Sequence, residues 1–245
     1  MIDRDADGDK RAFYARRGGW RADFWTLLHP PYTAWNLSYV VMGASLAPRL
    51  DWLRLALTLA AFLAGTGVAS HALDELNGRP LKTGFTDREL KWLALVGLGA
   101  GFGAALVGAF VISPWILAWA VVGSALAAAY SLEWWGGIIH SGPGFALSWG
   151  AFPVLVGYWA QAETLSLPAL CLALAAALLS MTQRSLSLPA RFARRRAASA
   201  VVLFRTSEGE TRWERQELLA TWETPLRLLA WTTVSLAAGP AAWRW

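Results

Sequence analysis

The sequence predicts an all-α fold, a polytopic membrane bundle of about seven transmembrane helices. Two observations predict it: 56% of the 245 residues are hydrophobic while 16% are charged, and the mean hydropathy is positive. One soluble core cannot bury so much apolar surface, so a membrane protein is the expected class. The single cysteine, Cys171, excludes an internal disulfide.

Charged or Gly/Pro-rich segments separate the apolar runs and set the expected helix boundaries. The predicted spans are residues 33–48, 52–73, 91–112, 114–131, 144–162, 167–186 and 225–243. Pro153, Pro168 and Pro240 fall within or beside spans, so we expect kinks that neighbouring helices support. We therefore expect residues 1–32 to form an N-terminal segment, 33–196 the main bundle, 197–224 a soluble connection and 225–245 the last span.

The distribution of Lys and Arg predicts the orientation. Nineteen of the 22 fall in the N-terminal segment and in residues 74–91 and 184–227, which leaves Arg49, Arg54 and Arg244 for the opposite side. The N-terminus, these segments and the short 132–143 loop should therefore be cytoplasmic. Basic loops facing anionic lipid also explain an isoelectric point near 9.8 without nucleic acid. We expect a multi-pass protein of the inner or plasma membrane, with membrane lipid and no nucleic acid as a partner.

The soluble connection predicts a β-hairpin followed by a helix at the membrane interface. Residues 201–204 and 211–213 flank turn residues 207–209, and residues 214–222 have an amphipathic pattern. The connection is too small to form an independent domain.

The polar segment 69–84, at the end of the second span, is the first candidate site. If residues 68–76 are helical, His71, Asp74 and Glu75 stand on one face, where they could hold Mg²⁺ or another divalent ion. Arg79 and Lys82 follow on the next loop. The alternative is a cytoplasmic loop whose charges are solvated.

The end of the sixth span is the second candidate. Gln183, Arg184, Ser187 and Arg191 place hydrogen-bond donors where an apolar helix enters the cytoplasm, which suits a phosphate or carboxylate head group. A basic flank that only fixes the topology is the alternative.

A glycine-rich loop at 130–144 is the third candidate because it contains His140. A lone histidine in such a loop is more often structural than a ligand, and His29, just before the first span, is treated in the same way. His71 and His140 fall on the same predicted side, so a bis-His haem or an axial ligand to a chlorin stays possible.

Four segments, in order, resemble the UbiA superfamily of intramembrane prenyltransferases and cover roughly residues 27 to 190. They are LHPPYTAWNLSYVVMGASLAP, DELNGRPLKTG, AAAYSLEWW and GPGFALSWGAFPVLVGYWAQ. The resemblance implies a bundle around a lipid-open cavity with its polar motifs on the cytoplasmic side. It implies an isoprenoid lipid or prenyl diphosphate as the ligand and Mg²⁺ as the cofactor. Asn36, Asn77 and Tyr130, in or beside the matched segments, join the expected substrate contacts.

The chain departs from the aspartate-rich motifs of this family. Asp74 matches the last aspartate of the first motif, but Ser70 stands four residues earlier and Thr66-Gly67 replace an Asn-Asp pair. The second motif should fall near residues 183–195, which contain no carboxylate. The family commonly has nine spans, two more than this chain predicts.

Two classes of function follow from the resemblance and its departures. The first is a prenyltransferase in which His71, Asp74 and Glu75 hold one Mg²⁺, Asp74 and Glu75 being the catalytic carboxylates, while Arg79 and Lys82 clamp the diphosphate. The second is a non-catalytic protein that binds an isoprenoid, quinone or pigment, or packs as a subunit of a membrane complex.

Overall fold

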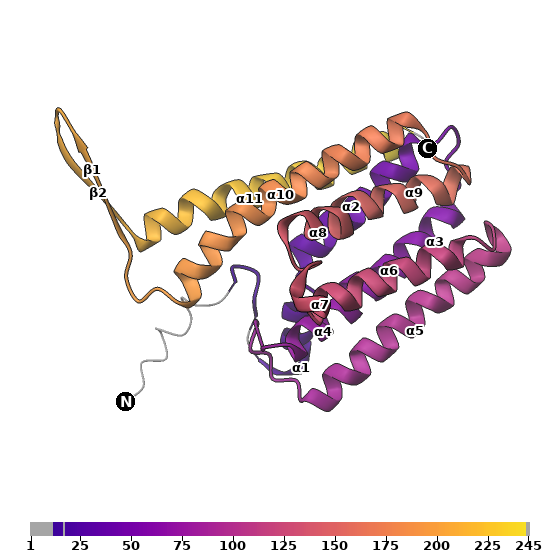
Figure 1. The fold of residues 1–245 in the computed structure, drawn as a ribbon, viewed down its shortest axis with the longest axis horizontal. Helices are drawn as coiled ribbons and strands as arrows, with labels where there is room; N and C mark the ends of the chain where they lie inside the picture. Colours follow the sequence, from indigo (N-terminus) through magenta and orange to yellow (C-terminus); the bar gives the residue numbers. More distant parts are fainter. Residues whose placement is uncertain (1–11, 17, 244–245) are drawn as a thin grey trace.

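The computed structural model describes residues 12–16 and 18–243, which are mostly helical (Figure 1). The elements in chain order, with η marking π-helical segments, are α1 (Gly19–Leu27), α2 (Pro30–Leu46), α3 (Trp52–Phe62), η1 (Leu63–Ser70), α4 (His71–Leu76), α5 (Asp87–Val111), α6 (Ile116–Ser131), α7 (Trp134–Gly137), α8 (Gly142–Ala146), η2 (Leu147–Ala151), α9 (Phe152–Ala162), α10 (Leu167–Arg195), β1 (Val201–Thr206), β2 (Gly209–Glu214) and α11 (Arg215–Ala242). Five basic residues that entered the orientation prediction lie outside the described residues: Arg4, Lys10, Arg11, Arg17 and Arg244.

Within the described chain, three helical stretches are long and apolar enough to cross a membrane. They are Trp52–Leu76, which joins α3, η1 and α4, then Asp87–Val111 and Leu167–Arg195. Large apolar side chains such as Phe110, Leu174 and Trp231 are exposed on the outer faces of the bundle, as expected for contact with lipid. The structure thus supports membrane association. A helix occupies each of the seven predicted ranges, while the seven-span topology stays a prediction.

Capping side chains explain where several helices begin. Asp51 accepts a hydrogen bond from the Arg54 N–H at the start of α3, and Ser166 does the same for α10. Thr86 and Glu89 form a capping box at the start of α5. These side chains satisfy amide groups that a helix leaves without partners at its first turn.

Helix α2 lies at the centre of the bundle and packs closely on α9. A Cβ at Gly43 would lie 2.1 Å from the Val154 carbonyl oxygen, and one at Gly157 would lie 2.2 Å from that of Val40. Glycine at both positions lets the two backbones meet. The Tyr39 hydroxyl donates to the Ala176 carbonyl, 3.2 Å away, and connects α2 to α10.

The connection between α10 and α11 differs in part from the sequence prediction. The hairpin is present as two antiparallel strands, fully exposed, projecting beyond the helices in Figure 1, so the all-α bundle carries a small two-stranded sheet. The helix predicted at 214–222 is present, but it is continuous with the last predicted span, because α11 runs from Arg215 to Ala242; its place at the membrane interface stays a prediction. A capping box between Glu214 and Glu217 starts this helix, and the buried Leu219 and Leu226 anchor it on both sides of Pro225.

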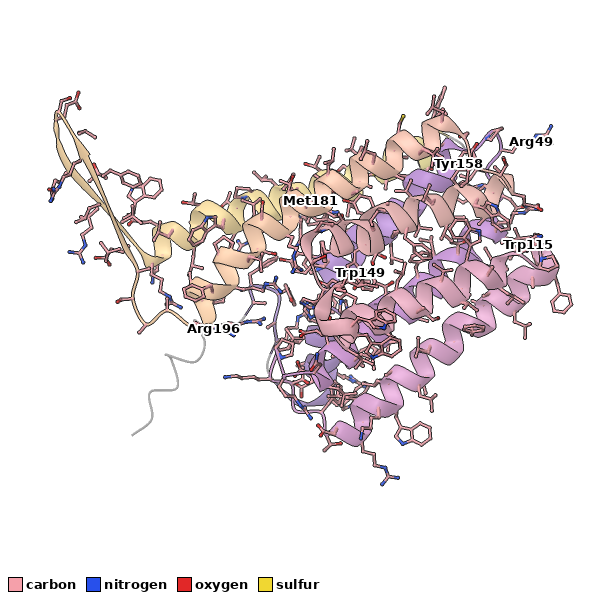
Figure 2. All side chains as sticks on the ribbon, in the orientation of Figure 1. Arg49, Trp115, Trp149, Tyr158, Met181 and Arg196 are labelled. Carbon is pink, nitrogen blue, oxygen red and sulfur yellow. The ribbon has the colours of Figure 1, made fainter. Side chains whose placement is uncertain are left out.

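The segments predicted to be cytoplasmic lie together at one end of the bundle. Residues 12–14, 74–81, 130–140 and the last turns of α10 all border one cavity. Figure 2 shows Arg196 toward this end and Arg49 with Trp115 at the opposite end. The grouping agrees with the charge-based prediction that these loops share one side.

Candidate functional site

A cavity of about 360 Å³ lies among the segments just described, and we call it the polar cavity. Ten of the thirteen site residues predicted from sequence line it: Asn36, His71, Asp74, Asn77, Tyr130, His140, Gln183, Arg184, Ser187 and Arg191. Helix α10 contributes several of them because positions 183, 184, 187 and 191 recur at helical spacing on one face. The structure therefore brings the three candidate segments together.

Glu75, Arg79 and Lys82 do not line the polar cavity. Glu75 is fully buried, and its carboxylate accepts hydrogen bonds from the Leu81 N–H at 2.8 Å and from the Thr83 N–H and hydroxyl at 2.8 and 3.1 Å. It holds the loop that follows α4. Arg79 donates to the Phe85 carbonyl and pairs with Asp87, and Lys82 is exposed.

The expected Mg²⁺ set therefore does not fit together around this cavity. The Nδ1 atom of His71 is hydrogen-bonded to the Gly67 carbonyl, 3.0 Å away, which leaves only Nε2 as a possible ligand atom, and the Glu75 carboxylate is engaged by the loop. Only Asp74 of the three predicted ligands presents a carboxylate to the cavity, whereas Mg²⁺ requires several oxygen ligands in octahedral geometry. Within the described part of the chain, no three His, Cys, Asp or Glu side chains group as a metal site.

A histidine pair forms one wall of the polar cavity. The rings of His29 and His71 stack with centroids 4.3 Å apart, and the Tyr14 hydroxyl lies 2.6 Å from His29 Nδ1. Burial, followed by the neighbouring His71, Arg195 and Arg191, holds the pKa of His29 well below its usual value. Burial likewise raises the pKa of the Tyr14 hydroxyl. At neutral pH both groups are uncharged, so the hydroxyl donates to the imidazole nitrogen.

His29 was expected from the sequence to be structural, and Tyr14 was not among the predicted site residues. His29 begins α2 with a backbone φ of 47°, a conformation that non-glycine residues adopt infrequently and that is associated with functional sites. Tyr14 reaches the cavity from the 12–16 segment through a contact fifteen residues away along the chain. No pattern in the sequence around Tyr14 predicts this contact.

Another part of the cavity wall, formed by the end of α10, is strongly basic. Arg184 donates to the Tyr130 hydroxyl at 2.8 Å and to the His140 carbonyl at 2.9 Å, so it is fixed by the protein itself. Arg194 pairs with Glu223. Arg195 also lines the cavity, and within the described residues no carboxylate pairs with it. Its guanidinium is therefore the one on this wall best placed to bind an anion.

Two buried amide oxygens also face the polar cavity. Asn36 Oδ1 and Gln183 Oε1 have no hydrogen-bond partner among the residues that the structure describes, and both residues are more than nine-tenths buried. The Asn36 amide nitrogen is used, since it donates to the Trp149 carbonyl at 3.1 Å. Unpaired buried acceptors are costly, so a ligand or water is expected to supply donors here.

A second, smaller cavity of about 100 Å³ neighbours the first, and we call it the apolar slot. It runs between the α3–η1 segment, α5, α6 and the η2–α9 segment, and its lining is mostly Leu, Ile, Phe, Ala and Gly. Thr66 and Trp149 line both cavities. Thr66 lies in η1 and Trp149 in η2, where Figure 2 shows it inside the bundle. π-Helical turns are frequent at functional sites.

Comparisons with protein-family models, with curated proteins and with solved structures found no match to this chain.

Proposed function

We propose that this protein is a multi-pass membrane protein that binds an isoprenoid lipid with an anionic head group, such as a prenyl diphosphate, inside its helical bundle. The observation that carries the proposal is a basic polar cavity beside an apolar slot, with Thr66 and Trp149 lining both at their junction. A ligand with one charged end and one hydrocarbon end matches this pair of compartments. The UbiA-like motifs in the sequence supply the isoprenoid class.

The head group would bind at the α10 wall. Among residues 12–16 and 18–243, no carboxylate pairs with the Arg195 guanidinium, and the hydrogen bond given for Arg191 is a long one, 3.4 Å, to the Ser187 carbonyl. Guanidinium groups bind phosphate oxygens in pairs and stay charged at all relevant pH values. This recognition needs no resident metal ion, which agrees with the incomplete Mg²⁺ set.

Prenyl transfer is the second candidate function, and the aromatic cluster at the junction favours it. Tyr130 contacts Trp149 edge-on, with ring centroids 5.5 Å apart, and lies 5.8 Å from Phe145. When the allylic C–O bond of a prenyl diphosphate breaks, the bonding electrons leave with the diphosphate and a carbocation remains. Aromatic faces stabilise such a cation, while nearby guanidinium groups stabilise the leaving anion.

The test combines two measurements on the purified full chain in mild detergent. Mass spectrometry of co-purifying lipids should find isoprenoids, and a titration with a prenyl diphosphate should show binding with and without Mg²⁺. Arg195→Gln should weaken the diphosphate complex by about 1.5–3 kcal/mol, the value of a hydrogen bond to a charged group. Arg196→Gln is the matched control, because the neighbouring arginine is exposed and does not line the cavity.

The outcomes separate the functions considered. Release of inorganic diphosphate from a bound prenyl diphosphate, with an acceptor present, would add the transfer reaction. A neutral quinone or pigment retained without any diphosphate affinity would reject the proposal and favour the pigment or quinone alternative. Equal effects of Arg195→Gln and Arg196→Gln would show that the α10 wall does not hold the head group.

A further inference from the structure

The hairpin formed by β1 and β2 stands clear of the helical bundle. Every residue of both strands is exposed, including the large side chains of Phe204 and Trp213, whose rings meet edge-on with centroids 5.1 Å apart. A two-stranded hairpin on its own is only marginally stable in water, and it gains stability when further strands pair with it. A strand added at one of its edges would therefore stabilise this hairpin.

The outer edge of β2 presents unpaired backbone groups at alternate residues. Thr206 pairs with Gly209 across a two-residue turn. Such a closing pair exchanges both of its backbone hydrogen bonds, and hydrogen-bonded and non-hydrogen-bonded pairs then alternate along the antiparallel ladder. The N–H and C=O groups of Glu210, Arg212 and Glu214 therefore point away from β1, along an edge whose side chains alternate in charge.

Antiparallel pairing of this edge with β2 of a second copy brings unlike charges together in one register. With Thr211 opposite Thr211 of the second copy, each Glu210 lies opposite an Arg212. Both residues direct their backbone groups to this edge, so each such pair exchanges both hydrogen bonds. A register centred on Arg212 or on Glu210 places like charges opposite each other. One centred on Trp213 pairs only the last residues of β2, because α11 begins at Arg215.

The register centred on Thr211 also gives matching neighbours on both faces of the sheet. On one face, Glu210 would lie between Arg205 of its own hairpin, with which it pairs at 2.7 Å, and Arg212 of the second copy. On the other face, Trp213 would cover Gly209 of the second copy, and an aromatic side chain across from a glycine stabilises a strand. Unlike charges on neighbouring strands are favourable as well. The edge is thus complementary to itself.

We propose that β2 pairs with β2 of a second copy of this chain, so that two hairpins form one four-stranded antiparallel sheet with a two-fold axis at Thr211. Figure 1 shows the hairpin beyond the ends of α10 and α11 and crosswise to them. Helix α10 is long and apolar enough to cross a membrane, so strands crosswise to it run along the membrane plane, where the hairpins of two copies can meet. Two-fold dimers built on one self-complementary surface are the commonest protein assemblies. The inference does not rest on the proposed function, since the hairpin does not line the polar cavity.

The central residue of the register gives a direct test. Thr211 would face its counterpart in a pair without backbone hydrogen bonds, where Cα atoms lie about 4.5 Å apart, a distance that a disulfide spans. The experiment places Thr211→Cys in a Cys171→Ser background, because Cys171 is an exposed free thiol. It follows disulfide-linked dimers of the full chain in phosphatidylcholine vesicles under mild oxidation. Thr211→Cys should cross-link about tenfold faster than Ser207→Cys, the matched control, which is also exposed but lies in the turn.

Two charge variants test the register itself. In the Thr211→Cys background, Arg212→Glu creates Glu–Glu contacts between like copies, and Glu210→Arg creates Arg–Arg contacts. Each variant alone should cross-link about tenfold more slowly than Thr211→Cys. A mixture of the two, distinguished by mass, regains both unlike pairs and should form mixed dimers at the rate of Thr211→Cys. A substitution that only disturbed the hairpin would not be rescued by mixing.

The outcomes decide between a second copy and other partners. Equal cross-linking of Thr211→Cys and Ser207→Cys would overturn the inference, and so would mixed copies that cross-link no faster than either charge variant alone. A nitroxide on Thr211→Cys with the oxygen accessibility of a lipid environment, in the absence of cross-linking, would instead assign the face that carries Phe204 and Trp213 to the membrane surface. Prenyl diphosphate binding should be the same in all these variants, so its failure would reject the proposed function and leave the pairing of hairpins standing.

Discussion

Replacing Glu75 tests whether its carboxylate stabilises the fold or acts as a metal ligand. Its oxygens accept three hydrogen bonds from Leu81 and Thr83, and the side chain is fully buried. Hydrogen bonds to a charged group contribute about 1.5–3 kcal/mol, and each abandoned buried donor costs about 1–3 kcal/mol. Glu75→Gln keeps one acceptor oxygen, so we expect a loss of about 2–4 kcal/mol. Glu75→Ala abandons all three donors and should lose about 4–5 kcal/mol.

The assay is thermal unfolding in mild detergent, followed by the fraction of protein that remains monodisperse. A loss of 2–4 kcal/mol corresponds to a fall in Tm of about 4–16 °C for a chain of this size. Asp74→Asn is the comparison, because Asp74 faces the polar cavity and its replacement should lower Tm much less. If Glu75→Gln unfolds at the parent's temperature, or if Asp74→Asn is the more damaging change, the reasoning that assigns Glu75 to the loop is refuted.

Three further predictions concern packing, pH and the N-terminal segment. Gly43→Ala should destabilise the bundle by about 1–3 kcal/mol or more, because the added methyl would strike the Val154 carbonyl; unchanged thermal unfolding would contradict this. The pKa of His29 is lowered in the folded state, so as pH falls the unfolded state binds a proton at a higher pH than the folded state does. Stability should therefore fall as pH drops below about 6.5. His29→Gln should flatten that pH dependence of Tm. Tyr14→Phe removes the hydroxyl that bonds His29 and should speed tryptic cleavage after Arg16; parental cleavage rates would show that this bond does not hold the segment.

The parts of the site on a single helix could be predicted from the sequence. Gln183, Ser187 and Arg191 share a face by helical spacing, and the structure places all three on the polar cavity. Arg195 continues the same spacing, but the predicted span ended at residue 186, ahead of Pro189 and the arginine run. Helix α10 instead runs to residue 195 because Ala190 and Ala193 pack on α11. A predicted helix extended to residue 195 would have placed Arg195 on the same face.

The parts that depend on distant contacts could not be predicted in this way. The helical spacing of His71, Asp74 and Glu75 is real, but the loop that folds back after α4 takes up the Glu75 carboxylate. Spacing along a helix gives the direction of a side chain and not its hydrogen-bond partner. The apolar slot also depends on distant contacts, because its lining residues Gly65 and Gly101 come together only when η1 packs against α5.

The charges around the polar cavity are the reason we propose an anionic ligand rather than a bound metal. Four arginines of α10, at positions 184, 191, 194 and 195, line it, against the three carboxylates of Asp74, Glu133 and Glu223. Glu223 is already paired with Arg194, and Arg184 is fixed by hydrogen bonds to Tyr130 and His140. Three guanidinium groups, at positions 184, 191 and 195, then remain against the carboxylates of Asp74 and Glu133. A divalent cation needs its anionic ligands close together, whereas a phosphate group needs only the guanidinium side. The segment where the UbiA resemblance places a second aspartate motif carries arginines instead, and we therefore propose that the protein itself supplies the positive charge that binds the head group.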